Sequence, residues 1–212
     1  MKSTPSYANQ RVGIFVDVQN LYHSAKNLYR GRVNYAELIK NLVGERQLIR
    51  AMAYVVKSEG VEPQRAPVRG PRRAEADRAG IAAGYGAAAR EGSADSGDLS
   101  SEAAFFEALE KAGLELRMKD LQIYAGGMKK ADWDVGMAVD AIRMSSFLDV
   151  IILVTGDGDF IPLVDYLKWG AGRLVEVAAF KRSASSKIQD VADRFIAIEE
   201  IPRAVMKGRL DR

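Results

Sequence analysis

Two aspartates follow a strongly apolar run in the C-terminal half of the chain. Residues 150–154 are all aliphatic and mostly β-branched, which is typical of a strand buried on both faces in a parallel sheet. Thr155, Asp157 and Asp159 come directly after this run, with glycines between them. In open α/β sheets, ligands bind at the carboxyl ends of the strands, and two carboxylates crowded there repel each other unless a cation or a proton intervenes. The pattern is compatible with a metal site, and equally with a strand-to-helix turn in which Asp159 caps the next helix.

A third aspartate ends an earlier strand of the same kind. Residues 11–17 are apolar between Arg11 and Asp17 and predict another buried strand with a carboxylate at its end. Residues 20–29 then have helical spacing, with Asn20 as the predicted N-cap and its amide expected near Asp17. His23 falls on the exposed or boundary part of this helix, where we expect no direct role.

The composition excludes several kinds of chemistry. The 212 residues include no cysteine, which excludes disulfides, thiolate catalysis and cysteine-based zinc sites. The single histidine leaves little support for Ser–His catalysis or zinc ligation. Catalysis would then depend on carboxylates and on hard cations such as Mg²⁺ or Mn²⁺. The net charge of +3 is compatible with a polyanionic partner without indicating one.

Hydropathy predicts a cytoplasmic protein that does not cross a membrane. No apolar run approaches the roughly 20 residues that a transmembrane helix needs. The first ten residues are polar and lack the apolar core of a signal peptide.

Strands and helices alternate along most of the chain. This rhythm predicts a three-layer α/β/α fold around a mostly parallel central sheet. Besides the elements above, we expect helices at 35–43, 101–112, 131–144, 160–169 and 185–195, and strands at 48–56, 114–119, 174–180 and 195–198, with 114–119 near the sheet edge.

Two segments stand outside this pattern. Residues 62–100 are rich in Pro, Gly, Ala, Arg and Ser and almost free of large aliphatics, which predicts a flexible insertion. Their six arginines are matched by six acidic residues, so a solvated linker is favoured over a nucleic-acid-binding arm, which stays open. Residues 201–212 form a basic tail, expected to be loose from Pro202 onward.

The helix at 131–144 carries two acids with different expected roles. Its residues are apolar nearly all round, which predicts that it is heavily buried. Asp134 and Asp140 lie roughly 120° apart around the axis, at about 100° per residue. Asp134 shares its face with small alanines, so we expect it at the strand ends, although acids at a helix start also suit the helix dipole. Asp140 lies beside Trp133 and Arg143, where an ion pair or a packing hydrogen bond is the simpler role.

Common phosphate-binding motifs are absent. No Gly-Lys-Ser/Thr occurs, which excludes a Walker P-loop, and Gly156-Asp157-Gly158 lacks the third glycine of the dinucleotide fingerprint. The acids that remain predict a cluster that holds divalent metal, where two ions would clamp the attacking and leaving oxygens of a phosphodiester.

Three motifs together resemble the NYN domain in its bacterial LabA-like branch, a family similar to PIN-domain ribonucleases. They are residues 15–20, 130–141 and 154–160, in family order within residues 11–200. The resemblance implies a single domain with a PIN-like fold that cleaves RNA with metal ions held by about four aspartates. The segment 62–100 departs from the family, whose members usually have a short link there.

The resemblance also implies which residues form the site. The catalytic and metal-binding positions are carboxylates throughout: Asp17, Asp134, Asp157 and Asp159. The positions expected to support them or to meet a phosphate are polar: Asn20, Thr155, Ser185 and Ser186.

Three functions remain open at this point. The first is a ribonuclease that depends on Mg²⁺ or Mn²⁺ and acts on RNA, in single-stranded form. The second is a regulatory RNA- or protein-binding module whose acidic pocket holds a metal without turnover. A phosphatase is third, and is weakened because Asp17-Val18-Gln19 lacks the second acid of an Asp-x-Asp motif. A homo-oligomer is compatible with each of them.

Overall fold

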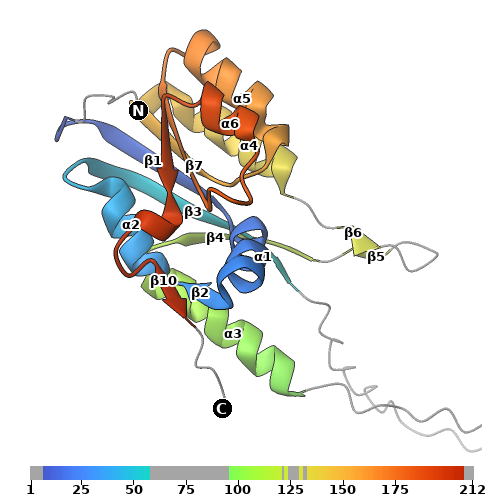
Figure 1. The fold of residues 1–212 in the computed structure, drawn as a ribbon. Coiled ribbons are helices and arrows are strands. Elements are labelled where there is room, and N and C mark those ends of the chain that lie inside the picture. The colour runs from blue at the N-terminus through green and yellow to red at the C-terminus, as the bar shows by residue number, and fades with distance from the viewer. Residues whose placement is uncertain (1–6, 58–95, 121, 124–128, 131–132, 208–212) are drawn as a thin grey trace, which may run out of the picture.

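A six-stranded sheet, in which each strand runs parallel to its neighbours, forms the middle layer of the protein (Figure 1). The computed structural model describes residues 7–57, 96–120, 122–123, 129–130 and 133–207. In spatial order the strands are β4 (Glu115–Asp120), β3 (Gln47–Lys57), β1 (Arg11–Asp17), β7 (Val150–Val154), β8 (Leu174–Ala179) and β9 (Arg194–Ala197). The predicted parallel sheet, with residues 114–119 at its edge, is confirmed.

Helices cover both faces of this sheet (Figure 1). One face carries α1 (Val18–Tyr29), α2 (Tyr35–Val43) and α3 (Ser96–Lys111). The other carries α4 (Asp134–Met144), α5 (Ile161–Asp165) and α6 (Ser186–Val191), with the short helices η1 (Ser145–Phe147), η2 (Gly158–Phe160) and η3 (Tyr166–Gly170) between them. The turn η4 (Ile198–Glu200) follows β9. The three-layer α/β/α prediction is confirmed.

Alternate residues of the central strands fill two separate cores. In β7, Ile152 and Val154 pack under α1 and α2, whereas Ile151 and Leu153 pack under α4 and α5. This follows from the period of two along a strand. A strand buried on both faces needs an unbroken apolar run, which is why the bounds of β7 and β1 match the sequence prediction.

The bounds of α3 and α6 differ from the sequence prediction. Helix α3 begins at Ser96 rather than Ser101, so the last five residues of the predicted insertion, 96–100, are helical. Residues 62–95 of that insertion lie outside the described residues. Helix α6 ends at Val191 and not near Phe195, because Arg194 already belongs to β9.

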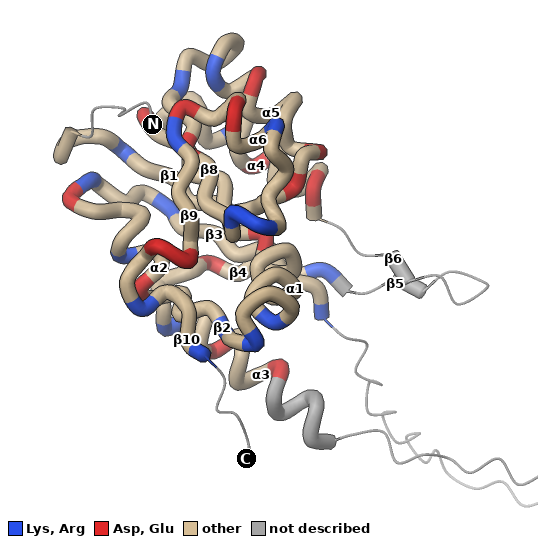
Figure 2. The backbone as a smooth tube through the Cα atoms, in the orientation of Figure 1, with Lys and Arg blue, Asp and Glu red and all other residues tan. Residues whose placement is uncertain are grey.

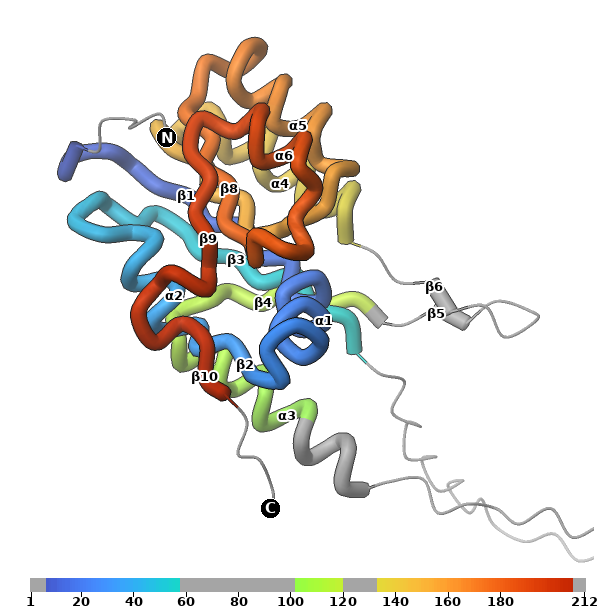
Figure 3. Tube along the Cα trace, in the orientation of Figure 1, coloured from blue at the N-terminus to red at the C-terminus, as the bar shows by residue number. Residues whose placement is uncertain are grey.

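The predicted loose tail contains a strand. Residues Val205–Lys207 form β10, which pairs antiparallel with β2 (Gly31–Val33), so this late segment lies beside an early one (Figure 3). Ala204, just before β10, is fully buried. A strand of three residues has no periodicity to detect, and only its distant partner stabilises it. A second small pair joins β5 (Gln122–Ile123) to β6 (Lys129–Lys130).

Helix α4 is less buried than its composition predicts. Only Met137 and Ala141 are buried, whereas Val135 is 74% exposed and Val139 and Ile142 are exposed as well. The prediction of a heavily buried helix is wrong. An outer-layer helix buries only the face toward the sheet, and nothing in the described structure covers the other side of α4.

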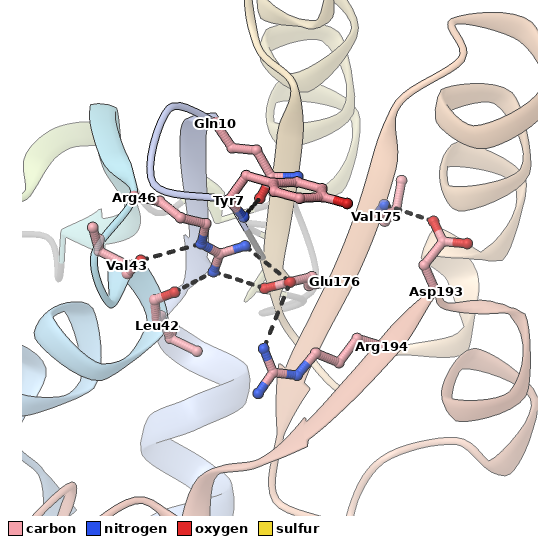
Figure 4. Close-up of polar contacts among 9 residues, drawn as sticks. All are labelled: Tyr7, Gln10, Leu42, Val43, Arg46, Val175, Glu176, Asp193 and Arg194. Carbon is pink, nitrogen blue, oxygen red and sulfur yellow. Dashed lines mark hydrogen bonds and ion pairs between the residues drawn. The ribbon is translucent and has the colours of Figure 1, made fainter. Parts of the chain in front are cut away.

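A buried ion pair joins α2 to the sheet (Figure 4). Arg46 donates to both carboxylate oxygens of Glu176, at 2.9 and 3.0 Å, and its remaining donors bind the carbonyls of Leu42 and Val43 at the end of α2. Arg194 lies 3.8 Å from the same carboxylate. Arg46 thus satisfies carbonyls at the C-terminal end of α2 and holds this end against the middle of β8.

Basic and acidic residues are both scattered over the described part of the fold (Figure 2). Among the described residues, no helix has the length and apolar character that spanning a bilayer requires.

Candidate functional site

Asp17 lies where β1 passes directly into α1. One carboxylate oxygen accepts the backbone N–H of Asn20 at 3.0 Å, and the other accepts the hydroxyl of Thr155 at 3.1 Å. Asp17 is therefore the N-cap of α1. The prediction that Asn20 caps this helix is wrong, because the helix begins two residues earlier than its apolar spacing indicates.

The loop after β7 is joined to Asp17 through polar side chains. Thr155 is fully buried, donates to Asp17 and accepts the backbone N–H of Asp157 at 3.3 Å. The side-chain oxygen of Asn20 accepts the backbone N–H of Gly156 at 3.1 Å. Buried Thr155 cannot meet a substrate, so its place is behind the site, where it orients the Asp17 carboxylate.

Gly156 allows a close approach that positions this loop. A Cβ at Gly156 would lie 2.9 Å from the Cα of Ala184, and the Gly156 carbonyl accepts the backbone N–H of Ser185 at 2.9 Å. The segment before α6 therefore packs directly on the loop after β7. Any side chain at Gly156 would push the two segments apart.

Asp157 and Asp159 do not play the same part. The Asp157 carboxylate accepts the backbone N–H of Asp159 at 2.9 Å and so caps η2. The alternative in which Asp159 is the cap is therefore wrong. Asp159 is exposed and lies on the side of η2 that faces α4 and α5.

Trp133 fixes the start of α4 against the sheet. Its indole N–H donates to the carbonyl of Val55 at 2.8 Å, and its ring meets Tyr54 edge-on at 5.5 Å between centroids. Asp134 follows immediately, and acidic segments gather in this region, where α4 begins (Figure 2). The anchored tryptophan thus holds Asp134 near the carboxyl ends of β1 and β3.

Asp140 is occupied by structural contacts, as predicted. It accepts the hydroxyl of Tyr54 at 3.1 Å and lies 3.4 Å from Arg117. Burial, together with the charge of Asp140, raises the pKa of Tyr54, which stays protonated as a donor.

The acids meet at one pocket of about 220 Å³ at the carboxyl edge of the sheet. We call it the acidic pocket. Its lining is polar and aromatic: Asp17, Gln19, Asn20, His23, Tyr54, Trp133, Asp134 and Asp157. Three of the four predicted aspartates are brought together here, and Asp159 lines a neighbouring groove that also includes Asp134.

The ionised form of Asp17 is destabilised in this pocket. Burial raises the pKa of its carboxyl above the ordinary value of 3.8, and the negative charge of Asp157 raises it further. The hydrogen bonds from Asn20 and Thr155 oppose this shift only in part. A cation in the acidic pocket would relieve the repulsion.

The donor set suits a hard cation, although no compact cage is formed. Within the described ranges, no three Asp, Glu, His or Cys side chains lie close enough to hold a metal ion together. Mg²⁺, however, usually keeps several waters and takes only one or two carboxylates from the protein. Asp17 and Asp157 supply that number, with carboxylate oxygens of the kind Mg²⁺ prefers. The residues fit a cation held by two carboxylates, and not a closed cluster of all four aspartates.

The two predicted serines lie beside the site rather than in it. The Ser185 hydroxyl packs against Gly158, where an added Cβ would lie 3.1 Å from it. Ser186 is exposed in the first turn of α6. Neither serine lines the acidic pocket.

His23, Gln19 and Tyr54 line the acidic pocket without having been predicted. His23 follows Asn20 by three residues, a spacing that puts both on one face of a helix. This spacing is visible in the sequence and could have placed His23 beside Asn20. Tyr54 comes from the middle of an apolar strand and gives no such signal.

Comparison with known proteins extends these findings. The sequence matches the family model of the NYN domain over residues 11–199. A crystal structure of a protein of unknown function from Vibrio parahaemolyticus is similar, with a TM-score of 0.69 and 26% sequence identity, covering 96% of this chain and all of that chain. A comparison with curated proteins finds no match.

Proposed function

The chain belongs to the NYN domain family, and from this premise we propose that it is a divalent-metal-dependent ribonuclease. NYN domains are in general nuclease-like and associated with nucleic acids. The proposed catalytic residues are the aspartates at the carboxyl edge of the sheet: Asp17, Asp134, Asp157 and Asp159.

One observation carries the proposal. Asp17 at the end of β1, Asp157 in the loop after the neighbouring strand β7, and Asp134 at the start of α4 line one pocket together. A site of this kind, open to solvent and lined by carboxylates, suits the hydrolysis of a phosphodiester, whose own negative charge needs a cation at the carboxylates.

The residues of the chain have distinct parts in this proposal. Thr155 and the N–H of Asn20 hold the Asp17 carboxylate in one orientation. The Asp157 carboxylate is held in turn by its hydrogen bond to the backbone N–H of Asp159, which caps η2. Asp134, across the pocket, can accept a proton from an attacking water.

The proposed cation is Mg²⁺ or Mn²⁺, held by Asp17 and Asp157. Bound there, it would supply positive charge against the phosphate and favour the ionised form of water. In the absence of a cation the same carboxylates would repel the substrate.

The finer assignments rest on sequence motifs. Residues 130–141 and 154–160 support the LabA-like branch of the family, in which RNA is the expected substrate. We further propose that the protein acts in the cytoplasm, on single-stranded RNA.

Labelled single-stranded RNA tests the proposal. The purified protein is incubated with it in Mg²⁺, in Mn²⁺ and in EDTA. We expect cleavage in either metal, none in EDTA, and a loss of at least about 100-fold in Asp157→Asn, the scale on which catalytic groups act. Asp190→Asn, an exposed aspartate of α6, is the matched control and should cleave at the wild-type rate. Equal rates in Asp157→Asn and wild type would remove the basis for the proposal.

A non-catalytic RNA- or protein-binding module is the second candidate. It is favoured by the helix-capping roles of Asp17 and Asp157, and by the lack of a three-ligand metal group among the described residues. Retained RNA binding with no cleavage in any metal would identify this function.

A further inference from the structure

A second hollow adjoins the acidic pocket. It has a volume of about 340 Å³ and lies between α4 and the segment formed by α5 and η3. We call it the α4–α5 groove. Apart from Asp134 and Asp159, its lining is apolar or aromatic: Val135, Ala138, Ile142, Phe160, Pro162, Leu163 and Tyr166.

The α4–α5 groove is continuous with the proposed catalytic site. Asp134 lines both hollows, and Asp159 lies in the wall of the groove. The rest of its lining is apolar and aromatic. A ligand that fits this arrangement has an anionic end, held at the aspartates through a cation, and a flat apolar part beside it.

Two apolar side chains that α4 contributes to the groove, Val135 and Ile142, are exposed. Val135 is 74% exposed, because α4 buries its sheet-facing side through other residues. Val135, Ala138 and Ile142 share one face of α4 at helical spacing. An exposed apolar strip that begins at a proposed catalytic residue indicates a binding surface.

Tyr166 is held as a platform in this groove. It begins η3, a π-helical turn in which the N–H of Ala171 donates to the Tyr166 carbonyl at 2.9 Å. π-helical turns are rare and frequently occur at functional sites. A Cβ on Gly170 would lie 3.0 Å from the Tyr166 ring, so this glycine lets the ring pack against the backbone while half of the side chain stays exposed.

We propose that the α4–α5 groove binds an unpaired base of RNA, stacked on Tyr166, while the adjacent phosphate lies at the aspartates. The proposal rests on the proposed ribonuclease function and adds the element that selects single-stranded substrate. Aromatic side chains stack on any base because every base has a π face. A paired base is covered by its neighbours in the duplex and cannot enter a groove between two helices.

The test uses a short single-stranded RNA that carries one 2-aminopurine, whose fluorescence falls when it stacks. Binding is titrated in Ca²⁺ and cleavage is timed separately in Mn²⁺. We expect Tyr166→Ala to weaken binding about 5- to 100-fold and to lose the fluorescence change, on the scale of one stacked base. Tyr166→Phe should behave as wild type, and Tyr166→Leu should resemble Tyr166→Ala, because the flat ring is what binds.

Trp169→Ala is the matched control. Trp169 lies in the same π-helical turn and is 82% exposed, but it does not line the groove. It should bind RNA as wild type does. The effect of Tyr166→Ala should also disappear with an abasic nucleotide in place of 2-aminopurine. Wild-type binding by Tyr166→Ala, or an equal loss in Trp169→Ala, would overturn the proposal.

Three outcomes separate this inference from the proposed function. Cleavage that is unaffected in Tyr166→Ala refutes the groove alone. Binding that depends on Tyr166, without cleavage in any metal, refutes the nuclease alone, and neither binding nor cleavage refutes both. If sedimentation instead shows a dimer that Val135→Glu dissociates while RNA binding is unchanged, the groove is a contact between copies of the chain and the proposal fails.

Discussion

Asp17 stabilises the fold as a helix cap and destabilises it as a charged group. As the N-cap of α1 it stabilises the helix through its bond to Asn20. As a partly buried carboxylate beside Asp157 it is costly to ionise, which is the reason for its raised pKa. Substitution by asparagine separates the two, because asparagine caps a helix equally well but carries no charge.

Asp17→Asn should therefore stabilise the protein at neutral pH. A raised pKa in the folded state means that this state binds the proton more tightly than the unfolded chain, so stability falls as the pH rises through the folded pKa. We expect a higher melting temperature for the variant, by about 2–4 °C for each kcal/mol relieved. The difference should vanish below the ordinary value of 3.8.

Melting curves across pH, with and without Mn²⁺, measure this. Mn²⁺ should raise the midpoint of the wild type more than that of Asp17→Asn, since it binds the native carboxylates. A variant that melts with the wild type at every pH, in both conditions, would contradict the electrostatic account.

Asp134 and Asp140 should respond differently to substitution. Asp134→Asn should abolish cleavage with little change in melting, because its carboxylate lies at the acidic pocket. Asp140→Ala should cost about 1–3 kcal/mol, since it leaves the buried hydroxyl of Tyr54 with only the weak Met52 sulfur as an acceptor. Cleavage rates per folded molecule and melting temperatures for both variants decide this. A catalytic Asp140 and a structural Asp134 would reverse the assignment.

At the scale of elements, the position of α2 depends on one buried ion pair. The side chains of Arg46 and Glu176 are only 4% and 5% exposed, so both charges have lost nearly all their water. The exposed pair between Arg50 and Glu115 resembles it in chemistry, but its side chains are about half exposed, at 49% and 52%. The two pairs differ most in burial, and the buried pair is also bidentate.

Breaking the buried pair on one side should destabilise the fold strongly. Arg46→Met leaves Glu176 charged in the core and should cost about 3–5 kcal/mol. The double variant Arg46→Met/Glu176→Met should recover much of that loss, because no unpaired charge remains. Arg50→Met, the exposed control, should cost at most about 1 kcal/mol. Urea unfolding of the four proteins measures these values, and equal losses in Arg46→Met and Arg50→Met would contradict the role of burial.

At the scale of the whole molecule, the long segment between β3 and α3 should not determine stability. Strand β3 precedes it and pairs in parallel, from Met52 to Lys57, with β4, which follows α3. Residues 62–95 are poor in large aliphatics, so we expect them to add little to the two cores.

Replacing residues 62–95 with a short Gly/Ser link should leave the free energy of unfolding within about 1 kcal/mol, because loop-closure cost varies slowly with length. Thermal and urea unfolding of the shortened chain check this. If its arginines contact RNA, the salt dependence of binding should also flatten on deletion. A collapse of the unfolding transition would show that the segment belongs to the fold.

Local patterns in the sequence were enough for the framework of this protein. The bounds of β1, α2 and β7 follow from apolar periodicity and from turn or capping residues at their ends, all of which act within a few residues. The alternation of strands and helices predicts the three layers, and parallel strands necessarily bring Asp17 and Asp157 to one edge of the sheet.

Tertiary structure decided what depends on distant partners. Thr155 belongs to the site motif, yet it lies behind the site because β7 is central in the sheet. One face of α4 is exposed because no described element packs against it. Strand β10 forms only because β2 lies beside it. An apolar composition indicates that a side chain can be buried. Only the three-dimensional packing determines whether another element lies against it.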